Sequence, residues 1–235
     1  MKRGIKELFF RSVILLIGLV IAHLGVTLFL ISNLGSDPFN VLVKGTYFRL
    51  SSLWEYFGFA EEILTHGRVH IAISLIIIVV LLIVDRSYIK IGTVLCMVCG
   101  GPIIDFFTWI LNPVLRNFTG LAPRIIILAI GCVILAYGMT IVIKSDAGTG
   151  PNDLVAVVIS DKLKKKFSIT RIIVDLMFAI IGCLLGWGVG FELGVHVGIG
   201  TLIAMALVGP VAGIFLPINE KMIGKVLSNV LKSGS

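Results

Sequence analysis

Charged residues are scarce in this sequence. Only 14% of the 235 residues are Asp, Glu, Lys or Arg, whereas 57% are hydrophobic. A soluble domain carries about 25% charged residues on average, so most of this chain must face lipid. Apolar runs that are long enough, or nearly long enough, to cross a bilayer as a helix occur at 12–31, 71–84, 91–111, 124–143, 172–190 and 196–218. The sequence therefore predicts an all-α, polytopic membrane protein with six spans.

Motifs for catalysis and for cofactor binding are also missing. The chain has no His-Glu-x-x-His, no Gly-x-Ser-x-Gly and no Walker phosphate-binding loop. Cys96 and Cys99 have the spacing of a redox or zinc pair, but no second Cys or His pair lies near them at ligand spacing. We therefore expect no enzyme activity, no cofactor and no metal, and we expect the cysteines to pack between helices.

Basic residues are concentrated in the gaps between the apolar runs. The formal net charge is +7, yet no separate basic domain exists that would indicate nucleic acid as a partner. The two richest stretches contain Lys2, Arg3, Lys6 and Arg11 near the start and Lys162, Lys164, Lys165, Lys166 and Arg171 in one connection. This is a positive-inside distribution, with anionic lipid headgroups as the partner. No signal-peptide cleavage site follows the first apolar run, so we expect a retained first helix and both chain ends in the cytoplasm.

The sequence contains an internal repeat. Residues 18–43 align without gaps with 131–156 at a shift of 113, and 91–107 align with 199–215 at a shift of 108. Most matched positions are Gly, Pro, Ser or Thr, which two unrelated membrane helices would not share through composition alone. We infer two homologous halves. The halves, their connection and the cytoplasmic tail are 10–111, 123–218, 112–122 and 219–235.

Each half places a polar turn after its first long helix. The turns contain Gly35, Ser36, Asp37 and Pro38 in the first half and Gly148, Thr149, Gly150 and Pro151 in the second. Proline is favoured in the first turn of a helix, and Asp37 or Thr149 can cap the helix that follows. We therefore predict a short helix from each proline, over 38–50 and 151–161.

The short helices leave two topologies open. At about 1.5 Å per residue, neither reaches across the hydrocarbon core. If they are re-entrant, each half has three spans and the second half is inverted; if they cross, each half has four and the repeats are parallel. Basic residues do not decide, because 15 of the 20 lie inside in the first arrangement and 16 in the second. Segment length favours the inverted arrangement.

A signature in the second half resembles the YczE/YyaS/YitT group of bacterial integral membrane proteins, and the YczE branch most. It consists of the turn at 148–153, then Arg171 and Asp175, then 198–202 and 208–210. The resemblance implies a multi-pass protein of the bacterial cytoplasmic membrane and does not imply a substrate. The first half departs from the pattern, since Asn40 stands where such proteins often have Asp.

Ionisable side chains inside the apolar segments are candidates for function, because a charge in hydrocarbon is costly unless it is paired or hydrated. Arg171 and Asp175 lie four residues apart on one helix face, either as a structural ion pair or as part of a solute or proton site. Asp153 lies one turn into the second short helix, and Asn40 is its counterpart in the first. Asp105, near a proline kink, is either a specialised acid or a residue of the outer interface.

These features favour a transporter or exporter of a small solute. Transporters built from repeats bind their substrates where broken helices expose backbone groups. Helix amino termini favour anions, but Asp37, Asp146 and Asp153 crowd the turns, which favours a zwitterion, a cation or a proton-coupled step. We expect Asp153, Arg171 and Asp175 to form one cluster on the cytoplasmic side of a cavity.

Two other functions remain open. The chain can be a non-catalytic accessory protein that supports an enzyme or biosynthetic system, with its basic connection at 162–171 as the docking surface. It can also be the substrate-binding membrane subunit of an ATP-driven importer, because six spans without an ATPase domain suit that role. A homo-oligomer is compatible with all three functions.

Overall fold

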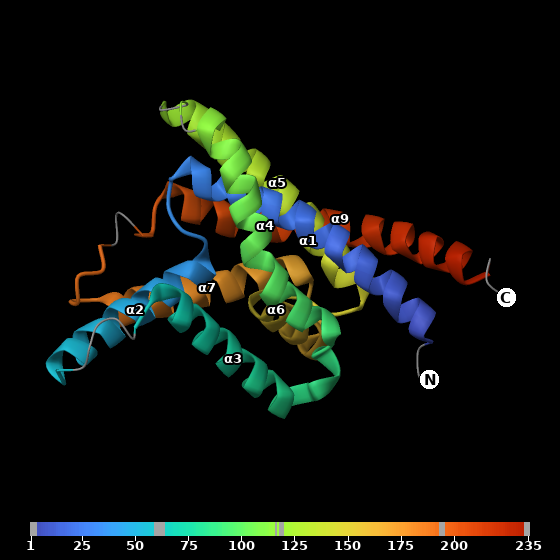
Figure 1. The fold of residues 1–235 in the computed structure, drawn as a ribbon, viewed down its shortest axis with the longest axis horizontal. Helices are drawn as coiled ribbons and strands as arrows, with labels where there is room; N and C mark the ends of the chain where they lie inside the picture. Colours follow the sequence, from blue (N-terminus) through green and yellow to red (C-terminus); the bar gives the residue numbers. More distant parts are fainter. Residues whose placement is uncertain (1–3, 59–63, 116, 118–119, 193–195, 233–235) are drawn as a thin grey trace.

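The computed structural model of the protein describes residues 4–58, 64–115, 117, 120–192 and 196–232. Within them the chain forms α-helices and one 3₁₀ turn, and no strand. The elements are α1 (Ile5–Ser32), α2 (Pro38–Tyr56), α3 (His66–Asp85), η2 (Arg86–Tyr88), α4 (Ile91–Leu115), α5 (Leu121–Ser145), α6 (Pro151–Leu163), α7 (Phe167–Gly186) and α9 (Ile199–Lys232). Both chain termini lie at the same end of the bundle (Figure 1). The predicted all-α class is confirmed.

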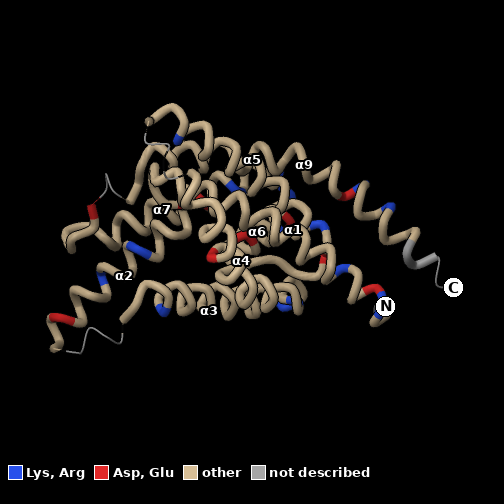
Figure 2. Tube along the Cα trace, turned by 45° about the horizontal axis from the view of Figure 1, so that its top comes forward, with Lys and Arg blue, Asp and Glu red and all other residues tan. Residues whose placement is uncertain are grey.

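Six of the described helices are long and apolar enough to cross a membrane: α1, α3 with its 3₁₀ turn, α4, α5, α7 and α9. Large apolar side chains stay exposed along them, such as Ile17 on α1, Ile83 on α3 and Leu184 on α7. Contiguous apolar surface of this kind suits hydrocarbon rather than water. Charged residues lie mainly toward the helix ends, with a small group at the centre near α6 (Figure 2). The predicted count of six spans is confirmed.

The two helices that follow the polar turns, α2 and α6, are not among the six. α6 has 13 residues and therefore covers about 20 Å. α2 has 19 residues and is less apolar, with Lys44, Arg49 and Glu55 among them. It is six residues longer than predicted, because no Gly or Pro follows residue 50 before the helix ends at Tyr56.

α1 and α5 pack along each other through glycines. A side chain at Gly25 would overlap the backbone of Leu135 on α5, and a side chain at Gly138 would overlap the backbone of Ala22 on α1. The sequence shift of 113 converts one contact into the other, because Gly25 corresponds to Gly138 and Ala22 corresponds to Leu135. Glycine at these positions lets two membrane helices approach closely enough for extensive van der Waals contact.

The two polar turns have the same backbone conformation. α1 ends at Asn33 with φ 49° and α5 ends at Asp146 with φ 56°, both left-handed. Two residues later, Gly35 and Gly148 have φ angles of 140° and 134°, which glycine alone adopts readily. The chain then starts α2 or α6 at a proline.

Each turn is hydrogen-bonded to the other half of the chain. The N–H of Gly92, at the start of α4, donates to the carbonyl of Ala147 over 2.8 Å. The N–H of Gly200, at the start of α9, donates to the carbonyl of Leu34 over the same distance. Each half thus holds the break in the other half.

The last carbonyls of α1 and α5 are bound in the same crossed manner. Nη1 of Arg11 on α1 donates to the carbonyl of Ser145 over 2.9 Å, and Nε of Arg124 on α5 donates to the carbonyl of Ser32 over 2.6 Å. Arg11 and Arg124 are themselves related by the shift of 113. A helix end buried in a membrane needs such partners, because lipid offers no hydrogen bonds.

α7 ends before the predicted boundary at 190. The helix stops at Gly186, and Trp187 is extended. Gly188 and Gly190 have φ angles of 74° and 82°, outside the α-helical region. The apolar run continues past this point, but its glycines break the helix.

α9 continues through most of the segment predicted as a tail. It begins at Ile199 and reaches Lys232. The buried Asn219 donates to Oγ1 of Thr140 over 2.7 Å, and Ile223 and Leu227 pack into a cluster with Ile141. This part of α9 therefore belongs to the bundle.

The close packing of α1 and α5 predicts a large effect for Gly25→Leu. The added side chain collides with backbone that cannot move independently, so the free energy of unfolding should fall by at least about 2 kcal/mol. Thermal unfolding of the purified protein in detergent measures the effect. Gly224→Leu on α9 is the matched control, because a Cβ at Gly224 meets no other atom within 4 Å. Equal melting temperatures for both variants would contradict the proposed packing.

Candidate functional site

A cavity of about 330 Å³ lies inside the bundle, where α2 and α6 begin. Apolar side chains from α1, α4, α5 and α9 form much of its wall, and polar groups come from His23 on α1, from α2 and its cap Asp37, and from α3, α6 and α7. The apolar residues include Leu19, Val26, Phe29, Met97, Leu135, Met139 and Val208. The amino ends of both short helices thus line one space, which we refer to as the interior cavity.

Asp37 caps the amino end of α2. One carboxylate oxygen accepts from the N–H of Asn40 over 3.2 Å, and the other accepts from the Asn40 side-chain amide. Pro38 occupies the first turn of the helix, as predicted. The predicted cap is therefore confirmed for the first half.

The amino end of α6 has no side-chain cap. Gly150 occupies the cap position, so the prediction that Thr149 can cap this helix is wrong. The first N–H groups of any helix have no partner within the helix, and here Asn152 and Asp153 line the cavity at this end. Asp153 adds a carboxylate to the first turn, where it interacts favourably with the helix dipole.

Arg171 joins two carboxylates next to the interior cavity. Its Nε donates to Oδ2 of Asp175 over 3.0 Å, and its Nη1 donates to Oδ1 of Asp153. Arg171 is 8% exposed and Asp175 only 2%. The structure thus brings together the three residues that the sequence predicted as a cluster. We refer to them as the buried triad.

The two halves contribute different polar groups to the same cavity. Asn40 and Asp153 are equivalent at the shift of 113, and both line it. Arg171 and Asp175 come from α7, whereas α3 supplies His70 and Ser74, which are also four residues apart. Sequence reasoning missed His70 and Ser74. A polar pair at helical spacing inside an apolar run was the signal that could have found them.

Asp105 lies apart from this site. It is an exposed residue of α4 and does not line the interior cavity, although its neighbour Ile104 does. The side chain at 105 therefore points to another face of α4.

The turn before α2 is tied to the start of α9. The Thr201 hydroxyl donates to the carbonyl of Ser36 over 2.6 Å, and the Ser36 N–H donates to the carbonyl of His196 over 3.2 Å. Lys44 donates to the Ser36 hydroxyl over 2.7 Å, with His196 Nδ1 at 3.4 Å from Lys44 Nζ. Burial lowers the pKa of His196, the Lys44 charge lowers it further, and Glu192 acts against both.

The equivalent turn before α6 is bound by different groups: Lys90 donates to the carbonyl and the carboxylate of Asp146, and the N–H of Gly92 donates to the carbonyl of Ala147. Thr93 and Thr149 correspond to Thr201 and Ser36 at the two sequence shifts. Both threonine hydroxyls are buried, and neither has a hydrogen-bond partner among the described residues. Among the described residues, the turn that contains Gly148 therefore lacks the hydroxyl bonds that hold the turn that contains Gly35.

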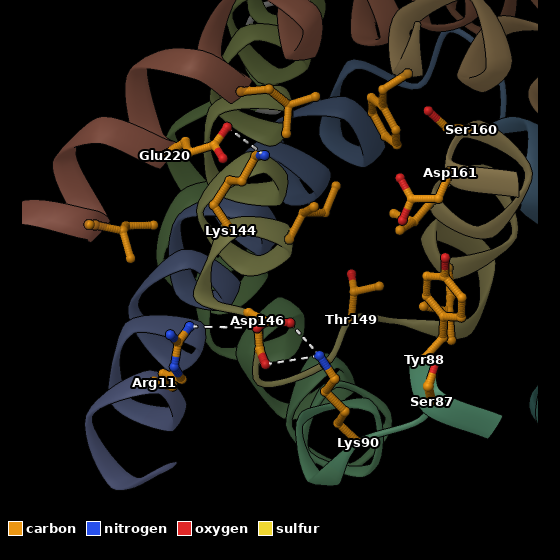
Figure 3. Close-up of a pocket in the computed structure, with 18 of the residues that line it drawn as sticks. Arg11, Ser87, Tyr88, Lys90, Lys144, Asp146, Thr149, Ser160, Asp161 and Glu220 are labelled. Atoms are coloured by element: carbon orange, nitrogen blue, oxygen red, sulfur yellow. Dashed lines mark hydrogen bonds and ion pairs between the residues drawn. The ribbon is translucent and has the colours of Figure 1, made fainter. Parts of the chain in front are cut away.

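A second pocket, of about 660 Å³, lies at the end of the bundle where α1 begins and α9 ends. Asp146 stands between Arg11 and Lys90 in this pocket, and Lys144 points to Glu220 (Figure 3). Lys90 donates to the Asp146 carboxylate, Arg11 lies 3.8 Å from it, and the Lys144–Glu220 pair is 2.8 Å long. We refer to this space as the end pocket.

The beginning of α6 separates the two spaces. Gly148, Thr149 and Leu154 line the end pocket, while Gly150 to Asp153 line the interior cavity. Residues 148–154 therefore border both spaces, and the hydroxyls of Thr93 and Thr149 beside them have no partner among the described residues. The sequence did not predict the end pocket, because its walls come from five separate stretches of the chain.

Six long helices expose apolar surface and surround a cavity that the buried triad lines. These features define a multi-pass integral membrane protein. The chain belongs to the DUF6198 family, described as a family of unknown function, which matches residues 9–217. The predicted resemblance to the YczE-like group is confirmed by its relatives.

The chain is 30% identical over 213 residues to the uncharacterized membrane protein YczE of Bacillus subtilis (strain 168), covering 90% of this chain and 88% of YczE. It is 26% identical over 206 residues to the uncharacterized protein YyaS of the same organism, covering 87% and 92%. An uncharacterized protein of Haemophilus influenzae is 28% identical over 209 residues, covering 89% and 84%. No solved structure matches the chain.

The buried triad predicts that Arg171→Met is strongly destabilising. It leaves the carboxylates of Asp153 and Asp175 without their cation, so the free energy of unfolding should fall by about 3–5 kcal/mol. The double variant Arg171→Met/Asp175→Leu should recover part of this loss, because it removes the more deeply buried orphan charge. Thermal unfolding in detergent compares the two, with Asp105→Asn as the neutral control. A double variant less stable than Arg171→Met would contradict this account.

Proposed function

We infer that this protein is a transporter that moves a small solute across the bacterial cytoplasmic membrane. The observation that carries this proposal is the interior cavity, which is lined by the amino ends of two short helices from different halves of the chain. Broken helices of this kind form the substrate sites of many secondary transporters. A protein with only a scaffolding role has no need of two helix breaks inside the membrane.

An inverted repeat is the arrangement that the contacts favour. Each half contributes three long apolar helices, an odd number, so the second half would enter the membrane in the opposite sense. The bonds from Gly92 to Ala147 and from Gly200 to Leu34 exchange under the repeat, as do those of Arg11 and Arg124. Such exchange is what a two-fold axis between the halves would produce.

The end of the molecule with both termini is proposed to face the cytoplasm. Basic residues gather there, as the positive-inside rule requires. They include Lys6, Arg11, Arg86, Lys90, Lys144, Lys162, Lys164, Lys165, Lys166, Lys221 and Lys225. The end pocket would then be a cytoplasmic vestibule, and anionic lipid headgroups would surround it.

Alternating access would work through the two turns. The turn with Ser36 holds three bonds to the 196–201 segment, so it closes the outer side. The turn with Gly148 has the end pocket on one side, the interior cavity on the other and two unpaired hydroxyls beside it. Opening this turn would connect the cavity to the cytoplasm while the outer turn stays closed.

Labelling of matched positions tests the inverted arrangement. In a background without native cysteines, Asn33→Cys and Asp146→Cys occupy equivalent positions of the two halves, and Arg86→Cys lies in the α3–α4 connection. A membrane-impermeant maleimide should label Asn33→Cys in right-side-out vesicles, where the outer face is accessible. It should label Asp146→Cys and Arg86→Cys in inverted vesicles, where the cytoplasmic face is accessible. Labelling of all three from outside would instead require parallel halves with four spans each.

Solute flux in proteoliposomes tests the proposed function. Purified protein should exchange at least one member of a panel of cations, anions, zwitterions and neutral metabolites faster than empty liposomes do. The Asp153 carboxylate is the most accessible acid of the triad, with 21% of its side chain exposed, so it is the group best placed to exchange a proton. Asp153→Asn should therefore flatten the pH dependence of flux, and Asp105→Asn should leave it unchanged. Absence of flux for the whole panel would favour an accessory role.

A further inference from the structure

One oxygen of the buried triad has no partner. Oδ2 of Asp175 accepts from Arg171, but Oδ1 has no hydrogen-bond donor among the described residues. The residue is 2% exposed and lines the interior cavity. Buried carboxylate oxygens are almost always hydrogen-bonded, since an unpaired one loses its hydration without compensation. Oδ1 of Asp175 is therefore an unsatisfied hydrogen-bond acceptor, for which a solute in the cavity can supply the donor.

The charge around the cavity is negative. Three carboxylates, of Asp37, Asp153 and Asp175, line the cavity together with one guanidinium, that of Arg171. The amino ends of α2 and α6 add about half a positive charge each. With the histidines counted as neutral, about one negative charge remains, and the solute that balances it carries one positive charge.

Much of the remaining wall is apolar, with neutral polar groups from His23, Asn40, His70, Ser74 and Asn152 among it. Phe29, Phe39, Ile71, Leu135 and Met139 surround the polar groups. A small inorganic cation gains nothing from such walls, and no group of three His, Cys, Asp or Glu in the described part of the chain suits a metal ion. A volume of about 330 Å³ is near the lower end of the range for ligand pockets. These walls fit a small organic body attached to the positive charge.

We propose that the interior cavity binds a small protonated amine with an apolar body, whose ammonium group donates a hydrogen bond to Oδ1 of Asp175. The inference rests on the proposed function only in taking this cavity as the solute site. The N–H requirement separates a protonated amine from a quaternary ammonium ion of equal charge. The carboxylates disfavour organic anions, and a neutral amide leaves the negative charge unbalanced.

A probe series of constant shape tests the proposal on the wild-type protein. The probes are 2-phenylethylamine, its trimethylammonium analogue, 3-phenylpropionate and 3-phenylpropionamide. Equilibrium binding of each is measured with the protein in lipid nanodiscs at neutral pH. The primary amine should bind at least tenfold more tightly than each of the other three. Equal or tighter binding of the anion, of the amide or of the quaternary ion overturns the proposal.

Variants connect binding to the proposed acceptor. Asp175→Asn should weaken 2-phenylethylamine binding at least tenfold, whereas Asp105→Asn, the same chemical change outside the cavity, should not alter it. If Asp175→Asn does not yield folded protein, Asp153→Asn removes the neighbouring charge and should weaken binding several-fold. Unchanged binding in whichever of the two variants folds overturns the proposal.

Flux measurements separate this inference from the proposed function. Amine binding without exchange of labelled 2-phenylethylamine, or of any other solute, would leave the binding site in place and remove the transporter. Flux of an anion or a neutral solute, with no amine binding, would keep the transporter and remove the amine site.

Discussion

Two helices of this protein begin inside an apolar bundle, and lipid cannot satisfy the backbone groups that such a break exposes. Each break must therefore find its hydrogen bonds within the protein. The partners come from the other half of the chain: a glycine N–H at the start of α4 or α9 reaches each turn, and Arg11 or Arg124 reaches the carbonyls at the preceding helix end. The two halves are thus mutually dependent, because each supplies hydrogen bonds to the break in the other.

The same requirement explains why the glycines of the repeat are retained in both halves while many functional side chains differ. Gly25 and Gly138 keep α1 and α5 in contact, and Gly35 and Gly148 allow the chain to reverse. Around this common backbone, Asn40 occupies the position equivalent to that of Asp153. The α3 pair of His70 and Ser74 lines the same cavity as the α7 pair of Arg171 and Asp175. A symmetric frame therefore encloses an asymmetric, negatively charged site.

Asymmetry also extends to the turns. The Ser36 turn is held by Thr201, His196 and Lys44, whereas Thr93 and Thr149 have unpaired hydroxyls at the other turn. Lys90 and Arg11 instead bind Asp146 of that turn. The two turns beside the interior cavity are therefore held by different groups.

The sequence by itself determined the long apolar helices and the positions of the breaks. Apolar run length reports on hydrocarbon thickness, and glycine and proline report on local backbone conformation, so Pro38 and Pro151 could be identified as helix starts. Spacing of four residues was enough to pair Arg171 with Asp175, because that contact lies within one helix. Helix ends were less certain, as α7 and α2 illustrate, because hydrophobicity does not define where a helix stops.

Only the tertiary structure decided which segments meet. The bond from Gly92 to Ala147 joins residues far apart in the chain, and so do the walls of both cavities, where His70 and the buried triad line one and the same space. Local preferences carry no information about such pairs, since they arise from how α1 and α5 pack and from the direction in which each turn sends the chain. The unpaired oxygen of Asp175 also depends on the tertiary structure. That it lacks a donor among the described residues can be known only once the positions of all its neighbours are known.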